Sequence, residues 1–443
     1  MTGKCALSLL SYEQTYVEHL AEVNDVMDVI ATEDIYSRTH ALLVAKGDHL
    51  DHEAVVRIKQ HTLIKLLDTQ IEISNSLNNH RIYQQILAMI ADNPDIQDIH
   101  HRCKHADKLQ PICLAESIPL PLRTKLTVMA ERMPDEYEHC LFSAWASMII
   151  ALEMELPQRD VQFAFICGLF HDIGLIHLNG DFSDRENLSS EDWRTLQSHV
   201  VISAMILKEL GNYPNSVSVG VLEHHERIDQ TGYPTRKTGF KLNTFGQIVG
   251  SADLLYKICT NELDDQSHRL TASLPYFKMH RGAYRESIFN SIVRILNRCE
   301  YHPDCILSPE VAQLQAIQVS NKLRDMESDI SSLMELMADQ YASPCCLALT
   351  TMGLSLLETI RQSGITMGHT QDFLNSAEAA EEIDDLIEIS AMQHELLWLF
   401  KRFSWSLDDV LDHLPEWPEQ EMFQTQAHKF HTTLQSAWQI VTD

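Results

Sequence analysis

The chain has 443 residues, of which 44% are hydrophobic, and its 63 Asp and Glu outnumber its 34 Lys and Arg, so the formal net charge is -29. Such an acidic surface repels phosphate backbones, so DNA or RNA binding is not expected as the main function. The N-terminal apolar stretch is too short for a signal peptide, and no run of about 18 apolar residues occurs. We therefore expect a cytoplasmic protein without a membrane span, and the length predicts about two to four domains.

The first part of the chain predicts a small α+β domain. In residues 34–73, a short apolar run that ends at Gly47 precedes a segment with helical periodicity. This order favours strand, turn, helix and strand. Together with an amphipathic stretch around residues 15–30, it predicts a small N-terminal α+β and helical accessory domain over residues 1–125.

The rest of the chain has the periodicity of helices. Residues 135–260 alternate apolar helical faces with short loops and carry weak strand signals, which predicts an all-helical core within 126–305. Beyond Pro309, the segments 311–342 and 380–414 repeat apolar residues at spacings of three and four. We therefore predict a mainly α protein whose last part, 306–443, is a C-terminal helical domain.

A series of potential metal ligands lies in the middle third of the chain. The adjacent His171 and Asp172 follow the apolar segment VQFAFICGLF, where polar side chains are costly unless something satisfies them. A divalent cation satisfies them, and imidazole combined with carboxylate suits iron or manganese. Two such ions a few ångströms apart can activate a water molecule and clamp a phosphoryl group. The full series is His139, His171, Asp172, His199, His224, His225 and Asp253.

The order and spacing of these residues resemble a known family. His139, HDIG at 171–174, His199, HHERIDQTGYP at 224–234 and SAD ending at Asp253 resemble the HD-GYP subgroup of the HD-domain metal-dependent phosphohydrolases. The match covers residues from about 133 to 260. A lone histidine is usually a satisfied core or surface residue, and 23 histidines supply several by chance. Seven positions in family order, with HD and HH doublets, favour a real metal site in an HD-type helical core.

The resemblance implies which residues hold which ion. One ion is held by His139, His171, Asp172 and Asp253, and the other by Asp172, His199, His224 and His225, so that Asp172 bridges them as the catalytic residue. Some family members bind a third ion through a carboxylate one turn before the first histidine. Asp135 stands four residues before His139 and is either that ligand or a solvated residue near a helix start. We therefore expect two or three divalent ions.

The resemblance also implies an activity and the residues around it. It implies a metal-dependent phosphodiesterase that opens a cyclic dinucleotide, cyclic di-GMP in the family, to the linear dinucleotide or GMP. The triplet Gly232, Tyr233 and Pro234 is expected to border the substrate cleft or a partner surface, although a simple tight turn also explains it. Arg236 and Lys237 are either cations for a phosphate or a solvated basic turn. Partner signalling proteins could bind this loop or the C-terminal helices, and homodimerisation stays open.

Three positions depart from the family pattern. Where the family has a lysine after HDIG, this chain has Leu175. Where it has a glycine after the aspartate of the HHE loop, this chain has Gln230, and where it often has an arginine before the last aspartate, this chain has Gln247. An apolar side chain cannot replace a point charge that meets a phosphate. The alternative is therefore a catalytically weak or inactive signalling protein that binds metal or nucleotide and acts through partner contacts. A third alternative retains catalysis on another nucleotide or phosphoester.

Overall fold

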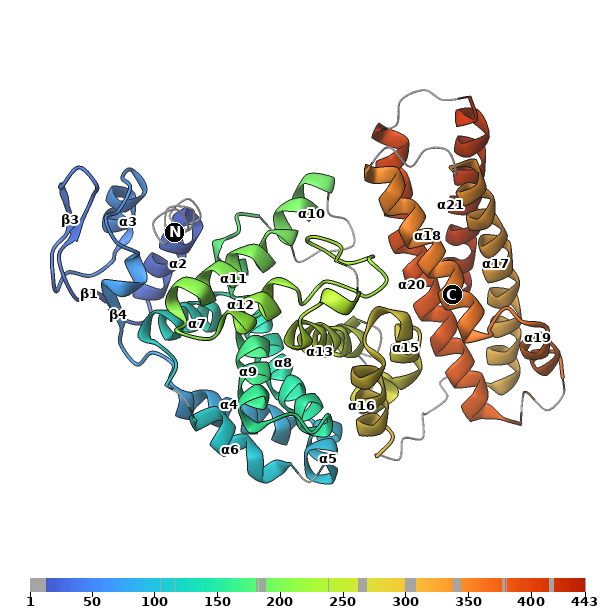
Figure 1. Cartoon of the computed structure of the whole chain (residues 1–443), viewed down its shortest axis with the longest axis horizontal. Helices are drawn as coiled ribbons and strands as arrows, with labels where there is room; N and C mark the ends of the chain where they lie inside the picture. The colour runs from blue at the N-terminus through green and yellow to red at the C-terminus, as the bar shows by residue number, and fades with distance from the viewer. Residues whose placement is uncertain are drawn as a thin grey trace. The chain divides into compact units, whose positions relative to one another are not determined.

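The structure is a computed structural model that describes residues 13–103, 105–115, 117–180, 182, 189–237, 239–261, 269–298, 308–337, 344–376, 379, 381–413 and 418–442. The chain forms two compact units, whose elements are labelled in Figure 1. Unit 1 comprises Met1–Glu226, Tyr233–Thr235 and Lys241–Tyr256, and unit 2 comprises Arg227–Gly232, Arg236–Phe240 and Lys257–Asp443. The domain limits expected from the sequence stay a prediction.

Unit 1 begins with a small region of short strands and helices. Strand β1 pairs with β4 and β2 with β3, both antiparallel. Gly47 has a φ of 90° in the turn after β3, a conformation that glycine adopts without steric cost. The order of strand, turn, helix and strand expected for residues 34–73 is confirmed by β3, the turn at Gly47, α3 and β4. The elements are α2 (Glu13–Asn24), β1 (Val29–Ala31), β2 (Ile35–Tyr36), β3 (Leu42–Val44), α3 (His52–Lys59), η1 (Leu67–Thr69) and β4 (Ile71–Ile73).

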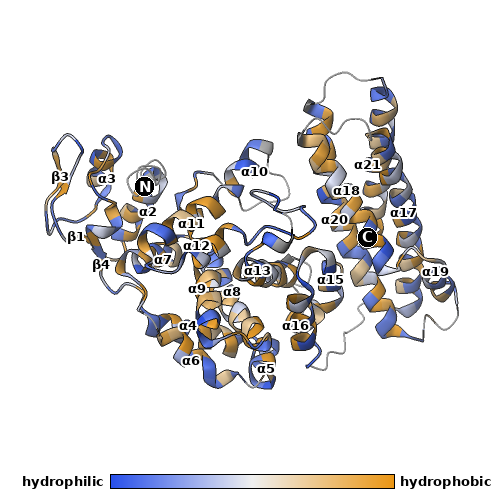
Figure 2. Cartoon of the chain, viewed as in Figure 1, coloured by the Kyte–Doolittle hydropathy of each residue, from blue (hydrophilic) through white to orange (hydrophobic). Residues whose placement is uncertain are grey.

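The remainder of unit 1 is helical. Figure 2 shows mainly hydrophobic residues on α9 and α11, and most residues of these two helices are buried. Helices that are apolar on most of their faces pack in the interior of a domain. The elements are α4 (Asn79–Asp92), α5 (Pro94–Arg102), α6 (Ala106–Leu114), α7 (Leu120–Arg132), α8 (Pro134–Glu153), α9 (Gln158–Phe170), η2 (Ile173–His177), α10 (Ser190–Gln197), α11 (His199–Leu210), α12 (Asn215–Leu222), η3 (Gly239–Lys241) and α13 (Thr244–Asn261).

A buried charged network joins the strand region to the helical part of unit 1. The Lys125 ammonium on α7 lies 2.8 Å from Asp68 on η1 and donates to His177 Nε2 on η2 at 3.1 Å. The Tyr16 hydroxyl of α2 also donates to Asp68, and the Tyr16 ring stacks on that of His177. Lys125 and Asp68 are only 2% and 1% exposed. A charge buried to that degree is stable only while it is paired, so the network fixes η2 against the N-terminal region.

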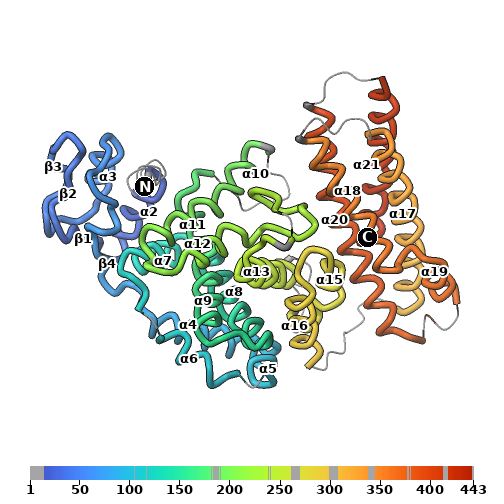
Figure 3. Tube along the Cα trace, in the orientation of Figure 1, coloured from blue at the N-terminus to red at the C-terminus, as the bar shows by residue number. Residues whose placement is uncertain are grey.

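Unit 2 contains four long helices that run alongside one another (Figure 3). Buried residues recur along α17 and α20 with alternating spacings of three and four, as in Val319, Leu323, Met326 and Ile330. This repeat places one apolar stripe on each helix, and the stripes form a common core. The elements are α14 (Arg269–Ala272), α15 (Leu274–Lys278), η4 (Arg281–Ala283), α16 (Glu286–Leu296), α17 (Pro309–Leu336), α18 (Pro344–Ser363), α19 (Gly368–Leu374), α20 (Ile383–His413) and α21 (Gln420–Thr442).

The predicted fold class is confirmed, since the described chain is mainly helical with short strands near its N-terminus. The helices expected from the segments 311–342 and 380–414 are α17 and α20. Among the helices described, none combines the length and apolar character needed to cross a membrane.

The buried network predicts a defined stability change. Replacement Lys125→Met leaves the Asp68 carboxylate buried without its cation, so we expect a loss of about 3–5 kcal/mol in the free energy of unfolding, measured by urea denaturation. The double variant Asp68→Asn/Lys125→Met removes both charges and is expected to lose less. Equal losses in the two variants would contradict this account of the network.

Candidate metal centre

The ligand series predicted from the sequence comes together inside unit 1. His139 lies on α8, His171 and Asp172 directly follow α9, and His199 is the first residue of α11. The doublet His224 and His225 comes just after α12, and Asp253 lies on α13. Within each of two groups, the ligand atoms lie within 4.8 Å of one another. The first group is Asp172, His199, His224 and His225, and the second is His139, His171 and Asp253.

Asp172 lies between the two groups. Its Oδ1 is 3.1 Å from His199 Nε2 and 3.5 Å from His224 Nε2. Its Oδ2 is 3.4 Å from His171 Nε2 and 3.7 Å from His139 Nδ1. Each carboxylate oxygen therefore faces a different set of imidazoles. This is the arrangement in which one carboxylate can bridge two cations, although metal binding by these residues stays a prediction.

The Asp253 carboxylate links the two groups on a second side. Its Oδ1 lies 3.2 Å from His139 Nε2, and its Oδ2 lies 3.6 Å from His225 Nδ1. The assignment of these residues to two separate ions stays a prediction.

Backbone carbonyls orient three of the histidine rings. Nδ1 of His171, His199 and His224 lies 2.8, 2.6 and 2.7 Å from the carbonyl oxygen three residues earlier in the chain. Each of these carbonyls belongs to the last turn of a helix, where carbonyl groups lack helical partners. A carbonyl only accepts, so Nδ1 carries the proton and Nε2 presents its lone pair to the centre. Metal-binding histidines are commonly oriented in this way.

The protonation of the cluster suits cation binding. Burial lowers the pKa of His171 to about 3, so its imidazole is neutral. Burial opposes the charged form of His139, but the carboxylates of Asp253, Glu136 and Asp172 together outweigh burial and raise the pKa of His139 to about 9. Metal binding at His139 would therefore release a proton.

Several ligand atoms are buried without an ordinary hydrogen bond. Within the described part of the chain, His139 Nε2, His171 Nε2 and Asp172 Oδ1 make none, although each lies 3.1 to 3.4 Å from a neighbouring ligand atom. Leaving such groups unsatisfied costs about 1–3 kcal/mol each. A divalent cation satisfies nitrogen and carboxylate donors together, so these residues fit a metal ion.

Gly174 of the HDIG segment allows α11 to approach the centre. Its N–H donates to Ser203 Oγ at 2.8 Å, and a Cβ at this position would collide with the carbonyl oxygen of His199. The absence of a side chain therefore lets His199 lie close to Asp172.

Sequence reasoning missed two residues at the centre. Glu136 forms a third potential metal group with His139 and Asp172, whereas Asp135 belongs to none of the groups found among the described residues. Glu136 is three residues before His139, so the same helix periodicity could have suggested it. The Tyr256 ring stacks on the His139 ring with centroids 4.3 Å apart, and no sequence motif marks that tyrosine.

The predicted loop residues fall in both units. Tyr233 belongs to unit 1, where its ring centroid lies 4.6 Å from that of His225 and its N–H donates to the His225 carbonyl at 3.1 Å. The Tyr233–Pro234 peptide bond is cis. Gly232, Arg236 and Lys237 belong to unit 2.

The structure also places the residues that depart from the family pattern. Leu175 is buried in η2 with 4% exposure. Gln247 is buried and donates to the Glu226 carbonyl at 3.0 Å. Gln230 has a φ of 64°, so the backbone keeps a left-handed conformation where the family has glycine.

Comparison with known proteins adds family information. Residues 119–286 match the family model described as HD domain. The chain is 31% identical over 172 residues to a cyclic di-GMP phosphodiesterase of Pseudomonas aeruginosa, over 38% of this chain and 42% of that relative. It is 27% identical over 107 residues to a 3'3'-cGAMP-specific phosphodiesterase of Vibrio cholerae, over 24% of this chain and 23% of that relative. The chain thus spans less than half of each of these relatives.

One solved structure is similar over much of the chain. It is described as an HDG"Y"P protein from Bdellovibrio bacteriovorus and has 16% sequence identity, with 60% of this chain and 95% of that chain covered. The TM-score is 0.33, which is too low to support a shared overall arrangement.

The close approach at Gly174 gives a test of the site. Replacement Gly174→Ala is expected to push α11 away and lower the free energy of unfolding by about 1–3 kcal/mol, with weaker manganese binding in a metal titration. Gly368→Ala is the matched control, because a Cβ there meets nothing within 4 Å. Unchanged stability and manganese affinity in Gly174→Ala would show that the contact does not constrain the centre.

Proposed function

We propose that this chain, whose residues 119–286 match the family model described as HD domain, is a metal-dependent phosphodiesterase that hydrolyses a cyclic dinucleotide. The observation that carries the proposal is the position of Asp172, whose two oxygens face two different sets of imidazoles. The names of the relatives support the substrate class. Cyclic di-GMP is the specific candidate, with the linear dinucleotide or GMP as product.

The chain's own residues have distinct roles in this proposal. His139, His171 and Asp253 hold one side of the centre, His199, His224 and His225 hold the other, and Asp172 joins them. Two ions bound there, iron or manganese, would supply water activation and offset the charge on the phosphoryl group. Carbonyls at helix ends keep three Nε2 atoms directed inward. A third ion, if bound, would use Glu136 or Asp135.

The acidic composition makes such cations necessary for an anionic substrate. With a formal charge of -29, the chain offers a phosphodiester little general attraction, so local positive charge has to come from bound ions or selected cations. Arg236 and Lys237 are the proposed protein cations, and Tyr233, next to His225, is the proposed border of the substrate site.

Replacement Asp172→Ala tests the metal centre and the activity together. We expect loss of bound iron or manganese and loss of cyclic di-GMP hydrolysis, because the residue shared by both ligand groups is removed. Metal analysis and hydrolysis are measured on the same preparation. Asp92→Ala, which removes an exposed carboxylate at the end of α4, is the matched control and should change neither. Undiminished hydrolysis in Asp172→Ala would refute the assignment.

A second candidate function is a catalytically weak or inactive signalling protein. The observation that favours it is Leu175, because a buried apolar side chain takes the position of the family's phosphate-binding lysine. Such a protein would bind metal or nucleotide and act through partner contacts of the loop around Tyr233 or of the C-terminal helices. Calorimetry that detects cyclic dinucleotide binding to metal-loaded protein without turnover would favour it.

Replacement Leu175→Lys separates a weakened activity from a changed substrate. If cyclic di-GMP is the substrate, restoring the cation is expected to raise kcat/KM by roughly tenfold, because a charge near the phosphate acts most strongly in the transition state. Leu175→Met is the uncharged control. No gain from the lysine would point instead to another nucleotide or phosphoester.

A further inference from the structure

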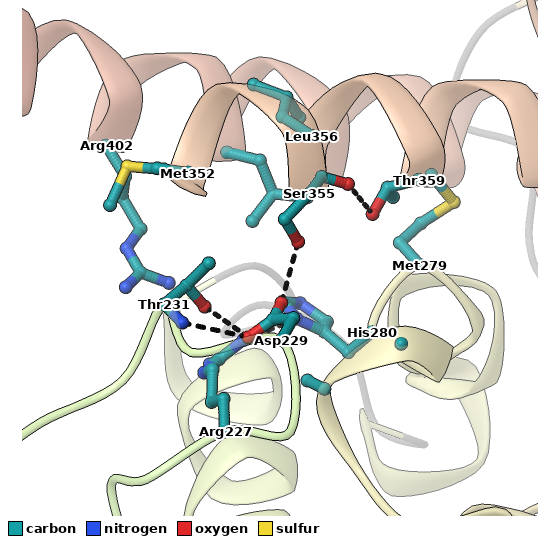
Figure 4. A pocket seen from close by; sticks show the side chains of 13 residues that line it. Arg227, Asp229, Thr231, Met279, His280, Met352, Ser355, Leu356, Thr359 and Arg402 are labelled. Atoms are coloured by element: carbon teal, nitrogen blue, oxygen red, sulfur yellow. Dashed lines mark hydrogen bonds between the residues drawn. The ribbon is translucent and has the colours of Figure 1, made fainter. Parts of the chain in front are cut away.

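The segment 227–232 continues directly from His224, His225 and Glu226, and it belongs to unit 2 together with the long C-terminal helices. A pocket in unit 2 lies between this segment, η4, α18 and α20 (Figure 4). Its lining includes Arg227, Asp229, His280, Ser355 and Arg402. The family match ends at residue 286, so α18 and α20 lie outside it.

Asp229 connects the segment to α18. Its Oδ1 accepts from the Thr231 N–H at 3.1 Å and from Thr231 Oγ1 at 2.7 Å, which shapes the segment internally. Its Oδ2 accepts from Ser355 Oγ at 2.7 Å, and Figure 4 shows these contacts converging on one carboxylate. Hydrogen bonds to a charged group are stronger than those between neutral groups. Ser355 therefore holds the side chain that shapes this segment.

Arg227 connects the same segment to α20. Its Nη1 lies 3.1 Å from His280 Nδ1, and His280 Nε2 lies 2.7 Å from Glu395 Oε1. Arginine has donors only, so His280 Nδ1 accepts and its Nε2 donates to Glu395. His280 and Glu395 are both only 4% exposed. A buried chain of hydrogen bonds thus runs from the segment to the helical bundle.

The backbone of the segment needs such support. Gln230 has a φ of 64°, a left-handed conformation that is unfavourable for a residue with a side chain. Residues held in that region persist where surrounding contacts determine their conformation. Besides the contacts of Arg227 and Asp229, the Ile228 N–H donates to the Ala283 carbonyl of η4 at 3.0 Å.

We propose that Ser355 is a positioning residue of the metal centre. Through Asp229 it holds segment 227–232 in the conformation in which the chain leaves His224 and His225. Its effect on the centre passes only along the chain, because segment 227–232 continues directly from His224, His225 and Glu226. The inference rests on the metal centre of the proposed function and does not depend on the substrate.

The experiment compares Ser355→Ala with the wild-type chain in two measurements. Hydrogen exchange of the peptide containing residues 224–234 reports how often the segment opens, and titration with Mn²⁺ reports the ligand geometry. Loss of one hydrogen bond to a carboxylate is expected to increase the exchange rate roughly tenfold. Groups hydrogen-bonded directly to metal ligands typically contribute about 10- to 100-fold in affinity, and Ser355 acts one step further out, so Mn²⁺ binding should weaken by roughly threefold.

Two further variants make the outcome specific. Ser355→Thr keeps the hydroxyl and should restore both properties. Thr359→Val is the matched control, because the Thr359 hydroxyl donates to the Ser355 carbonyl of its own helix at 3.0 Å, and it should change neither. In an Asp229→Ala background, Ser355→Ala should add little, since its acceptor is already absent.

The outcomes separate this inference from the proposed function. Wild-type exchange and Mn²⁺ affinity in Ser355→Ala would overturn the inference while leaving the phosphodiesterase proposal intact. Equal changes in Ser355→Ala and Thr359→Val would also overturn it, because they would indicate a general effect on α18. If the wild-type chain binds no Mn²⁺, the metal centre itself fails, and the inference falls with it.

Discussion

The structure of the helical core depends on one constraint, the burial of the Asp172 carboxylate among imidazoles. A buried anion is tolerated only where partners compensate it. Here Nδ1–H of His171, His199 and His224 donates to carbonyls at the ends of three helices, so each ring directs its Nε2 lone pair toward the carboxylate. Lone pairs do not compensate an anion, but a bound cation would satisfy the lone pairs and the carboxylate together. Helix ends therefore satisfy two requirements together, since their free carbonyls gain donors and the rings gain a fixed orientation.

Within each unit, a polar contact holds the element that follows a pair of ligand residues in the chain. Toward the N-terminus, the Lys125–Asp68 pair secures η2, the element that follows the HDIG turn. Toward the C-terminus, Asp229 and Ser355 secure the segment that follows the histidine doublet. Both contacts are polar and include a carboxylate. Hydrogen bonds and ion pairs require defined geometry, so these contacts fix the positions of the two elements as well as stabilising them.

Much of this organisation could be predicted from the sequence. The heptad-like spacing of α17 and α20 is local, so periodicity found both helices. His171 and Asp172 stood out because polar residues are costly next to an apolar segment, and the resemblance to the HD-GYP subgroup supplied the rest of the ligand series. The roles of Glu136 and Tyr256 could not be predicted with the same assurance, because a carboxylate near a helix start and an aromatic residue on an apolar helix are common without any site.

The helical character, the short N-terminal strands and the kinds of side chain available for a metal centre follow from residue type and near-neighbour spacing, so they could be read from the amino-acid sequence. The packed fold was needed to learn that Oδ1 and Oδ2 of Asp172 face different sets of imidazoles, and which ring nitrogens face inward. It also brought Asp68 to Lys125 and Ser355 to Asp229. These contacts join residues far apart in the chain, and their geometry arises from the packing of whole helices.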